Sequence, residues 1–208
     1  MVQQRTRAEQ GRPPEDAPAR PPEFEAALAA LATVHPRPEV ELEHIPAPQR
    51  LAPFAAAIGA RVAAPDDADD DLASGRFILL HDPEGHEAWA GTTRCVGFVS
   101  ALTDEHLVDD AMFSDVAWSW LTDALADSGA RHHAVGGTVT RTASTRFGSI
   151  AAPEHTVEVE IRASWTAQDT DLDRHLTAWL EVLANAAGLP PAGVHLLGVN
   201  GRVDDDHA

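Results

Sequence analysis

Hydrophobic and polar residues alternate most regularly between residues 156 and 165. An extended chain here would place five apolar side chains on one side: Val157, Val159, Ile161, Ala163 and Trp165. Charged and hydroxyl side chains would fall on the other side: Glu158, Glu160, Arg162 and Ser164. A period of two predicts a strand with one buried and one solvated face, which is typical of antiparallel sheets.

Other segments are also predicted to be strands: residues 75–81, 92–102 and 136–146. The first two flank residues 82–85 (DPEG), whose residue types suit the four positions of a type I turn, so we expect a hairpin there. Residues 51–64 are ambiguous, because their alanine content is typical of a helix whereas Pro53, Gly59 and a short alternation favour a strand. We interpret them as the strand before the hairpin.

Three segments combine helical spacing of apolar residues with start and stop signals. The first is predicted to start at Pro21 and Pro22, to place Phe24, Leu28 and Leu31 on one apolar stripe, and to be ended by Pro36 and Pro38. The second is predicted to start at Ser114, as the capping residue, and to end at Gly129. The third is predicted to be capped by Thr170 and to end at Gly188.

The predicted order of elements is therefore α-β-β-β-α-β-β-α. This order favours an α+β fold in which helices cover one face of an antiparallel five-stranded sheet. Residues 1–21 are expected to form a disordered arm, 22–199 a single domain and 200–208 a flexible acidic tail. The acidic run at residues 66–71 is predicted to be a solvated loop.

Composition narrows the function. The formal net charge of −18 argues against binding to nucleic acid or to an anionic membrane. The first residues lack the apolar core of a signal peptide, and no apolar run has the length of a membrane span, so we expect a cytoplasmic protein. A lone cysteine, Cys95, excludes an internal disulfide and is predicted to be a buried, inert thiol. Gly-rich phosphate loops and nucleophile elbows are absent, and no cofactor is expected.

One cluster could hold a metal ion. His81, Asp82, His86 and Glu87 surround the predicted turn, and two histidines could meet across a hairpin and share an ion with a carboxylate. Polar residues at the tip of a hairpin need no such role, so this stays an alternative.

Other residues are candidates for recognition. Trp118 and Trp120 lie two positions apart on the predicted second helix, about 200° around its axis, so one is expected at the margin of the core. Trp89 lies in a turn-like setting, and tryptophan is enriched at protein interfaces. Arg141 and Arg162 are expected near the outer face of the sheet, where they could pair with glutamates across strands.

Five blocks of the sequence resemble the family known as domain of unknown function 3000, from high-GC Gram-positive bacteria. They are residues 43–54 (EHIPAPQRLAPF), 74–89 (SGRFILLHDPEGHEAW), 118–121 (WSWL), 137–144 (GTVTRTAS) and 158–165 (EVEIRASW). The resemblance extends over about residues 22–190 and implies no activity, cofactor or catalytic residue. The order of elements is also similar to that of the small acidic chaperones of type III secretion, which are homodimers that bind other proteins.

The sequence therefore favours a non-catalytic protein-binding module, chaperone-like or adaptor-like, with a homodimer or another protein as the expected partner. A small metal-dependent hydrolase using His81 and His86 is the alternative. An acidic mimic of nucleic acid is a further, weaker alternative, because the chain carries many more carboxylates than cations.

Overall fold

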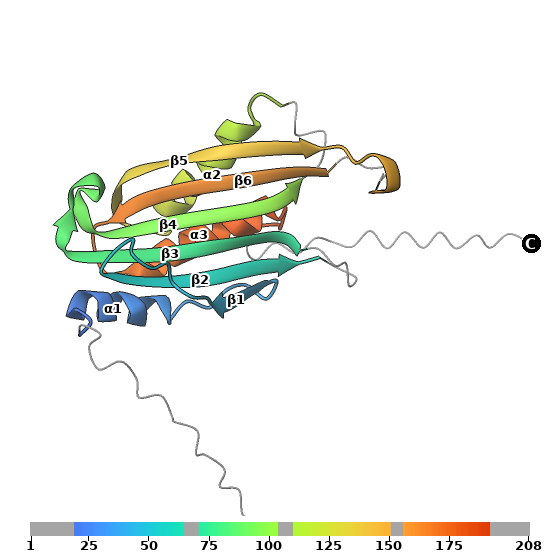
Figure 1. Ribbon diagram of the computed structural model, residues 1–208. Helices are drawn as coiled ribbons and strands as arrows, with labels where there is room; N and C mark the ends of the chain where they lie inside the picture. Colours follow the sequence, from blue (N-terminus) through green and yellow to red (C-terminus); the bar gives the residue numbers. More distant parts are fainter. Residues whose placement is uncertain (1–18, 65–70, 104–109, 151–155, 192–208) are drawn as a thin grey trace, which may run out of the picture.

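A computed structural model describes residues 19–64, 71–103, 110–150 and 156–191. Most of the predicted arm, residues 66–70 of the predicted acidic loop and the predicted tail lie outside these residues, while Asp71 of that loop begins a strand. The described chain forms a six-stranded antiparallel sheet in the order β1-β2-β3-β4-β6-β5 (Figure 1). The strands are β1 (Val40–His44), β2 (Phe54–Ala63), β3 (Asp71–His86), β4 (Gly91–Thr103), β5 (His132–Ser144) and β6 (Thr156–Ala167). The α+β class and the antiparallel sheet are thus confirmed, and residues 51–64 do contain a strand.

Three α-helices lie on one side of the sheet (Figure 1): α1 (Pro22–Leu31), α2 (Phe113–Asp127) and α3 (Leu172–Ala186). α3 crosses the middle of this inner face and contacts both other helices. Its Trp179 is 1% exposed and lies with Phe77 of β3 and Trp165 of β6 in the centre of the core. The five apolar residues of the alternating segment in β6 are all buried, as their period of two predicts.

The prediction of five strands is wrong by one, because β1 was not foreseen. β1 is only five residues long and follows a segment containing two prolines. Two of its residues, Glu41 and Glu43, point to the outer face, so its apolar signal is limited to Val40 and Leu42. A strand this short is fixed by pairing with β2 rather than by its own pattern.

The predicted turn at residues 82–85 is also wrong in its position. β3 continues through this segment to His86, and the connection to β4 is a 3₁₀ turn, η1 (Glu87–Trp89), followed by Ala90. The pairing with β4 jumps between His81 and His86, so residues 82–85 form a bulge inside the strand. The bulge nevertheless contains a hydrogen bond that is typical of turns: the Asp82 carboxylate accepts from the Glu84 amide at 3.1 Å.

The predicted caps of the second and third helices are not formed. α2 begins one residue before Ser114, and the Asp110 carboxylate instead accepts a hydrogen bond of 2.8 Å from the Met112 amide. α3 begins at Leu172 after Asp171, with no side-chain cap from Thr170. An aspartate precedes each helix instead: Asp110 before α2 and Asp169 before α3. The carboxylate of each accepts a hydrogen bond from the backbone amide two residues later. Such a local turn is an alternative to a side-chain cap at the helix start. The predicted helix ends are confirmed, since Gly129 and Gly188 follow them with positive φ angles.

The outer face of the sheet is not uniformly solvated. The connector of residues 45–53 between β1 and β2 crosses in front of β2 and β3 (Figure 1). The Ile45 side chain lies so close above Gly59 that a Cβ there would be 3.1 Å from its Cγ2 atom. The connector walls a hollow of about 570 Å³ that is also lined by Phe98 of β4. Leu80 on this outer side of β3 is buried, so the expectation of one wet face holds only for part of the sheet.

Candidate functional site

An apolar groove lies between α1 and β2, in the region where β1 has ended. Its volume is about 520 Å³. β1 pairs only with residues 58–62 of β2, so no strand of the described chain lies on that side of the first residues of β2. The groove is lined by three side chains of α1, by the β1 end and by the start of β2: Phe24, Leu28, Leu31, Leu42, Ala55, Ala56 and Ile58 among others.

The floor of the groove is a piece of open sheet edge. The Ile45 amide donates a hydrogen bond of 3.3 Å to the Ala57 carbonyl, which is the last backbone hydrogen bond along this edge among the described residues. Backbone groups of a strand point to the same side every second residue. Ala55 therefore directs its amide and carbonyl into the groove, at a level that β1 does not reach.

The walls are apolar and only partly covered. Leu28 on α1, Val34 after it and Ala56 on β2 pack against the core but are half-buried. Arg20 and Glu43 stand among the lining residues and are the charged groups of the site. An apolar lining with few polar groups is the usual character of a binding groove.

His81 fixes the end of α1 that borders the groove. Its ring is 3% exposed, stacks 5.8 Å from Phe24 and lies 6.3 Å from Phe54. Nδ1 lies 3.0 Å from the Thr93 hydroxyl, and Nε2 has no hydrogen-bond partner among the described residues. Burial lowers the pKa of His81, although Glu23 and Asp82 act in the opposite direction. The ring is thus a largely apolar anchor for α1.

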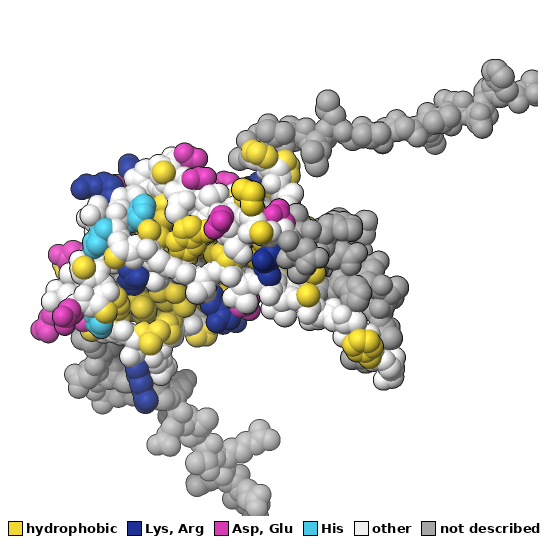
Figure 2. All heavy atoms as spheres, turned by 90° about the horizontal axis from the view of Figure 1, so that it is seen from above, with side chains coloured by type: hydrophobic (Ala, Val, Ile, Leu, Met, Phe, Trp, Pro, Cys, Tyr) yellow, Lys and Arg dark blue, Asp and Glu magenta, His cyan; other side chains and the backbone are white. Residues whose placement is uncertain are grey.

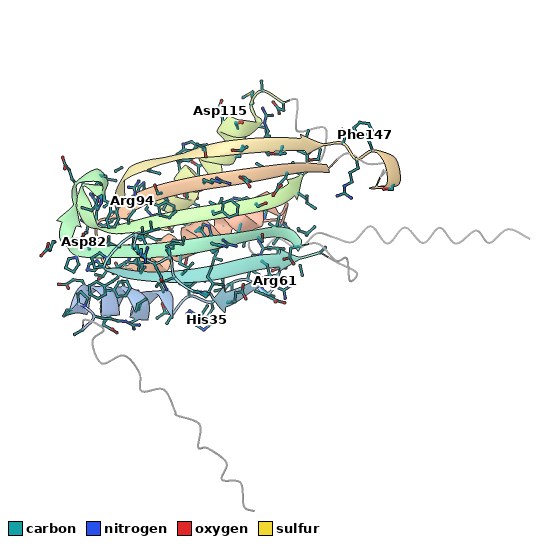
Figure 3. The ribbon with its side chains drawn as sticks, in the orientation of Figure 1. His35, Arg61, Asp82, Arg94, Asp115 and Phe147 are labelled. Carbon is teal, nitrogen blue, oxygen red and sulfur yellow. The ribbon has the colours of Figure 1, made fainter. Side chains whose placement is uncertain are left out.

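The four residues of the predicted metal site are not brought together. His81 faces the helices, whereas His86 is exposed and stacks at 4.5 Å on Trp89. Asp82, which lies at the same end of the sheet (Figure 3), binds the backbone of the bulge, and Glu87 starts η1. Within the described residues, no three His, Cys, Asp or Glu side chains are placed to hold a metal ion.

Trp89 belongs to a loop that is tied to the strands beside it. The Thr166 hydroxyl donates to the Trp89 carbonyl at 2.6 Å, and His133 lies 3.1 Å from the Ala90 carbonyl. Arg94 donates to the Ala134 carbonyl and to Thr166, each at 2.9 Å. His132 and His133 begin β5 and are half-buried.

Both Trp118 and Trp120 are half-buried, one on each margin of the buried stripe of α2. Trp118 packs below β5, where a Cβ on Gly137 would lie 2.8 Å from its ring. Trp120 meets Phe113 edge to face at 6.1 Å and lines a hollow between α2 and α3. We expected one of these two tryptophans at the margin of the core, and both lie there.

The two arginines lie on opposite faces of the sheet. Arg162 is on the outer face as expected, hydrogen-bonded to Glu160 at 2.7 Å and 5.5 Å from the Phe98 ring centre. Arg141 is opposite Val159 and therefore on the inner side, so its predicted position is wrong. It donates to the Asp110 carbonyl at 2.8 Å and lies 6.0 Å from Phe113, at the start of α2.

A buried polar pair was not foreseen. Trp165 of β6 donates its indole N–H to Nδ1 of His175 on α3, at 2.9 Å. Both residues are fully buried. Nε2 of His175 lies 4.0 Å from the Asp169 carboxylate. Burial lowers the pKa of His175 to about 4, so the ring is neutral at pH 7 and accepts the indole proton.

Comparison with known proteins identifies the family. The model of the family described as "Protein of unknown function (DUF3000)" matches residues 20–195. The chain belongs to the DUF3000 family. No curated protein matches the sequence, and no solved structure matches the fold, so the expected likeness to type III secretion chaperones is not shown.

The DUF3000 match includes all the residues that line the groove. The family description assigns no activity to any of them. None of the described helices has the length and apolar character that crossing a bilayer requires. The sequence held one signal for the groove, the apolar spacing of Phe24, Leu28 and Leu31, but the length of β1 that leaves the groove open could not be read from it.

Proposed function

We propose that this protein is a non-catalytic binding module that holds an extended apolar segment of another protein in the groove between α1 and β2. The observation that carries the proposal is the open backbone edge at Ala55 on the floor of an apolar groove. A bound segment would extend the sheet beyond the end of β1. An adaptor-like or chaperone-like role follows, because such a module holds a segment without changing it.

The open edge supports a polypeptide as the ligand rather than a lipid or another small apolar molecule. Main-chain groups of an added strand can pair with the Ala55 amide and carbonyl, which an acyl chain cannot do. Alternate side chains of that strand would point to the inner side, towards Leu28 and Phe54. The segment should therefore carry apolar residues at every second position.

The test begins with a phage-displayed library of random twelve-residue peptides selected on the full chain. We expect enriched peptides to alternate apolar and polar residues. One enriched peptide is then synthesised with a fluorescent label, and its Kd is measured by fluorescence anisotropy. Leu28→Glu should weaken binding by about 10- to 150-fold, because burying a leucine contributes roughly 1.5–3 kcal/mol.

Two further variants distinguish peptide binding in the groove from nonspecific hydrophobic binding. Val116→Glu makes the same kind of change on an exposed apolar residue of α2, and it should leave the Kd unchanged. Ala55→Pro removes the amide that points into the groove, a change that edge strands tolerate, and should weaken binding while the thermal unfolding midpoint stays close to that of the parent. A peptide that binds Leu28→Glu and Ala55→Pro as tightly as the parent protein, or a library that yields no enriched peptide, contradicts the proposal.

A further inference from the structure

β5 is a long and open edge of the sheet. It runs for thirteen residues, from His132 to Ser144, and β6 is its one neighbour among the strands that the structure describes. Most of its residues are exposed, and the chain continues past it to Phe147, which is 78% exposed (Figure 3). A strand in this position presents a row of backbone donors and acceptors with no partner strand among the described residues.

The two edges of the sheet differ in their protection. β1, at the other edge, has five residues and carries Glu41 and Glu43, and short acidic edge strands resist pairing with other chains. The regular part of β5, residues 136–144, has no proline, and Arg141 is its one charged residue. Its bulge lies at the beginning, between His133 and Gly136, and leaves the rest of the strand regular.

Charge distinguishes this edge from the rest of the chain. The protein has 33 acidic residues and a net charge of −18, so two copies repel each other over most approaches. Residues 128–153 contain no aspartate or glutamate at all, and they contain Arg131, Arg141 and Arg146. β5 lies wholly within this carboxylate-free segment. Two copies can therefore meet through β5 without bringing carboxylates of this segment together.

We propose that two copies of this protein associate through β5, as antiparallel neighbours related by a twofold axis at Thr140. The regular residues 136–144 are centred on Thr140, so this register gives their largest overlap. The two six-stranded sheets then continue into each other. The occupant of the edge is a second copy because, in this register, threonines of the outer face meet threonines and no charged residue of β5 meets another.

The match is clearest on the outer face. Thr140 meets Thr140 of the partner subunit, and Thr138 meets Thr142 of the partner subunit, so every threonine of this face meets a threonine, while Gly136 meets Ser144 of the partner subunit. Such cross-strand pairs are favourable. On the inner face, Gly137 meets Ala143 of the partner subunit, and Arg141 meets Val139 of the partner subunit, so neither arginine faces the other.

Hydrophobic surface accompanies the edge. Seen from above β5, hydrophobic side chains gather in the middle of this side of the molecule (Figure 2). Met112, which precedes α2, Val116 of α2 and Val135 of β5 are exposed apolar residues of these elements. Trp118 and Val139 are half-buried between the same two elements. Pairing through β5 brings these apolar side chains of α2 and β5 in each copy towards the other copy.

Cysteine substitution tests the register. Thr140→Cys places a thiol directly opposite its own copy, so a short bismaleimide should join the protein into a covalent dimer on a denaturing gel. Cys95 does not interfere, because it is fully buried and burial raises the pKa of its thiol. Thr138→Cys alone should not react, since its copy lies about 13 Å away, four residues along the strand. The double variant Thr138→Cys, Thr142→Cys should react again.

Sedimentation equilibrium of the unmodified full chain supplies an independent measurement. A dimer is expected, with a dissociation constant that falls as salt is added, because salt screens the repulsion between two acidic chains. A monomer at all concentrations and salt levels overturns the proposal. A dimer whose Thr138→Cys and Thr140→Cys variants crosslink equally also overturns it, because two copies paired at Thr140 cannot give that result.

Discussion

Replacing Trp179 by alanine is expected to lower the free energy of unfolding by about 3–5 kcal/mol. The Trp179 ring lies over Gly75 of β3 and Gly97 of β4, where a Cβ would be 2.8 Å from it at either position. Phe77 lies 5.9 Å away, ring centre to ring centre. Glycines cannot reach into the vacated space, so the cavity would persist. Urea unfolding followed by circular dichroism measures the loss.

A second substitution shows whether this packing is the cause. Gly97→Ala in the parent protein should cost about 1–3 kcal/mol, because the added methyl group has to displace the ring of Trp179. In the Trp179→Ala background the same change should cost much less, which a double-mutant cycle detects as a coupling energy. Trp120→Ala, at a half-buried position, should cost less than Trp179→Ala. Additive effects of the first two changes would show that the indole does not occupy this position.

The stability of the protein should decrease between pH 6.5 and pH 4 through His175. Its pKa is about 4 in the folded protein and near 6.5 in an unfolded chain, so in this interval the unfolded state binds more protons. Unfolding therefore becomes easier as the pH falls, by on the order of 3 kcal/mol over the interval. Burial is the main cause. Asp169, Asp171 and Asp173 oppose it, and His132 acts in the same direction as burial.

His175→Gln isolates this contribution from the many carboxylates that titrate in the same range. Glutamine can still accept the indole proton of Trp165 but does not titrate. At pH 7 the variant should be less stable than the parent, and the difference in unfolding free energy should narrow as the pH falls to 4. Trp120→Ala, which removes no titratable group, is the control and should give a constant difference. A constant difference for His175→Gln would contradict the assignment.

Periodicity predicted the elements in which one face is buried along the whole length. β6 and α3 are of this kind, because each buried position of β6 from Val157 to Trp165 repeats at two residues and each of α3 repeats at helical spacing. The residue types of a short segment predicted its local structure less well. Residues 82–85 have the composition of a turn, but the same Asp82 contact serves equally well in a bulge.

The candidate site could not be predicted, because it depends on pairing between distant segments. The groove exists because β1 stops at His44 while β2 starts at Phe54, beyond the pairing of β1. The position of Arg141 likewise depends on its alignment with Val159, which is distant in the sequence. The alternation of side chains along one segment shows which residues share a face of the strand. Which of the two faces is buried depends on the register with the neighbouring strand.

The place of α3 in the chain has a consequence for biosynthesis. The inner face of the sheet is built from residues 40–167, whereas the helix that covers its centre comes from residues 172–186. A ribosome delivers the strands first, so the nascent chain exposes Phe77 and Trp165 until that helix has emerged. During translation the hydrophobic inner face of the incomplete sheet therefore has to be protected from aggregation, for example by chaperones. Slow elongation before residue 172 would lengthen the time for which this face is exposed.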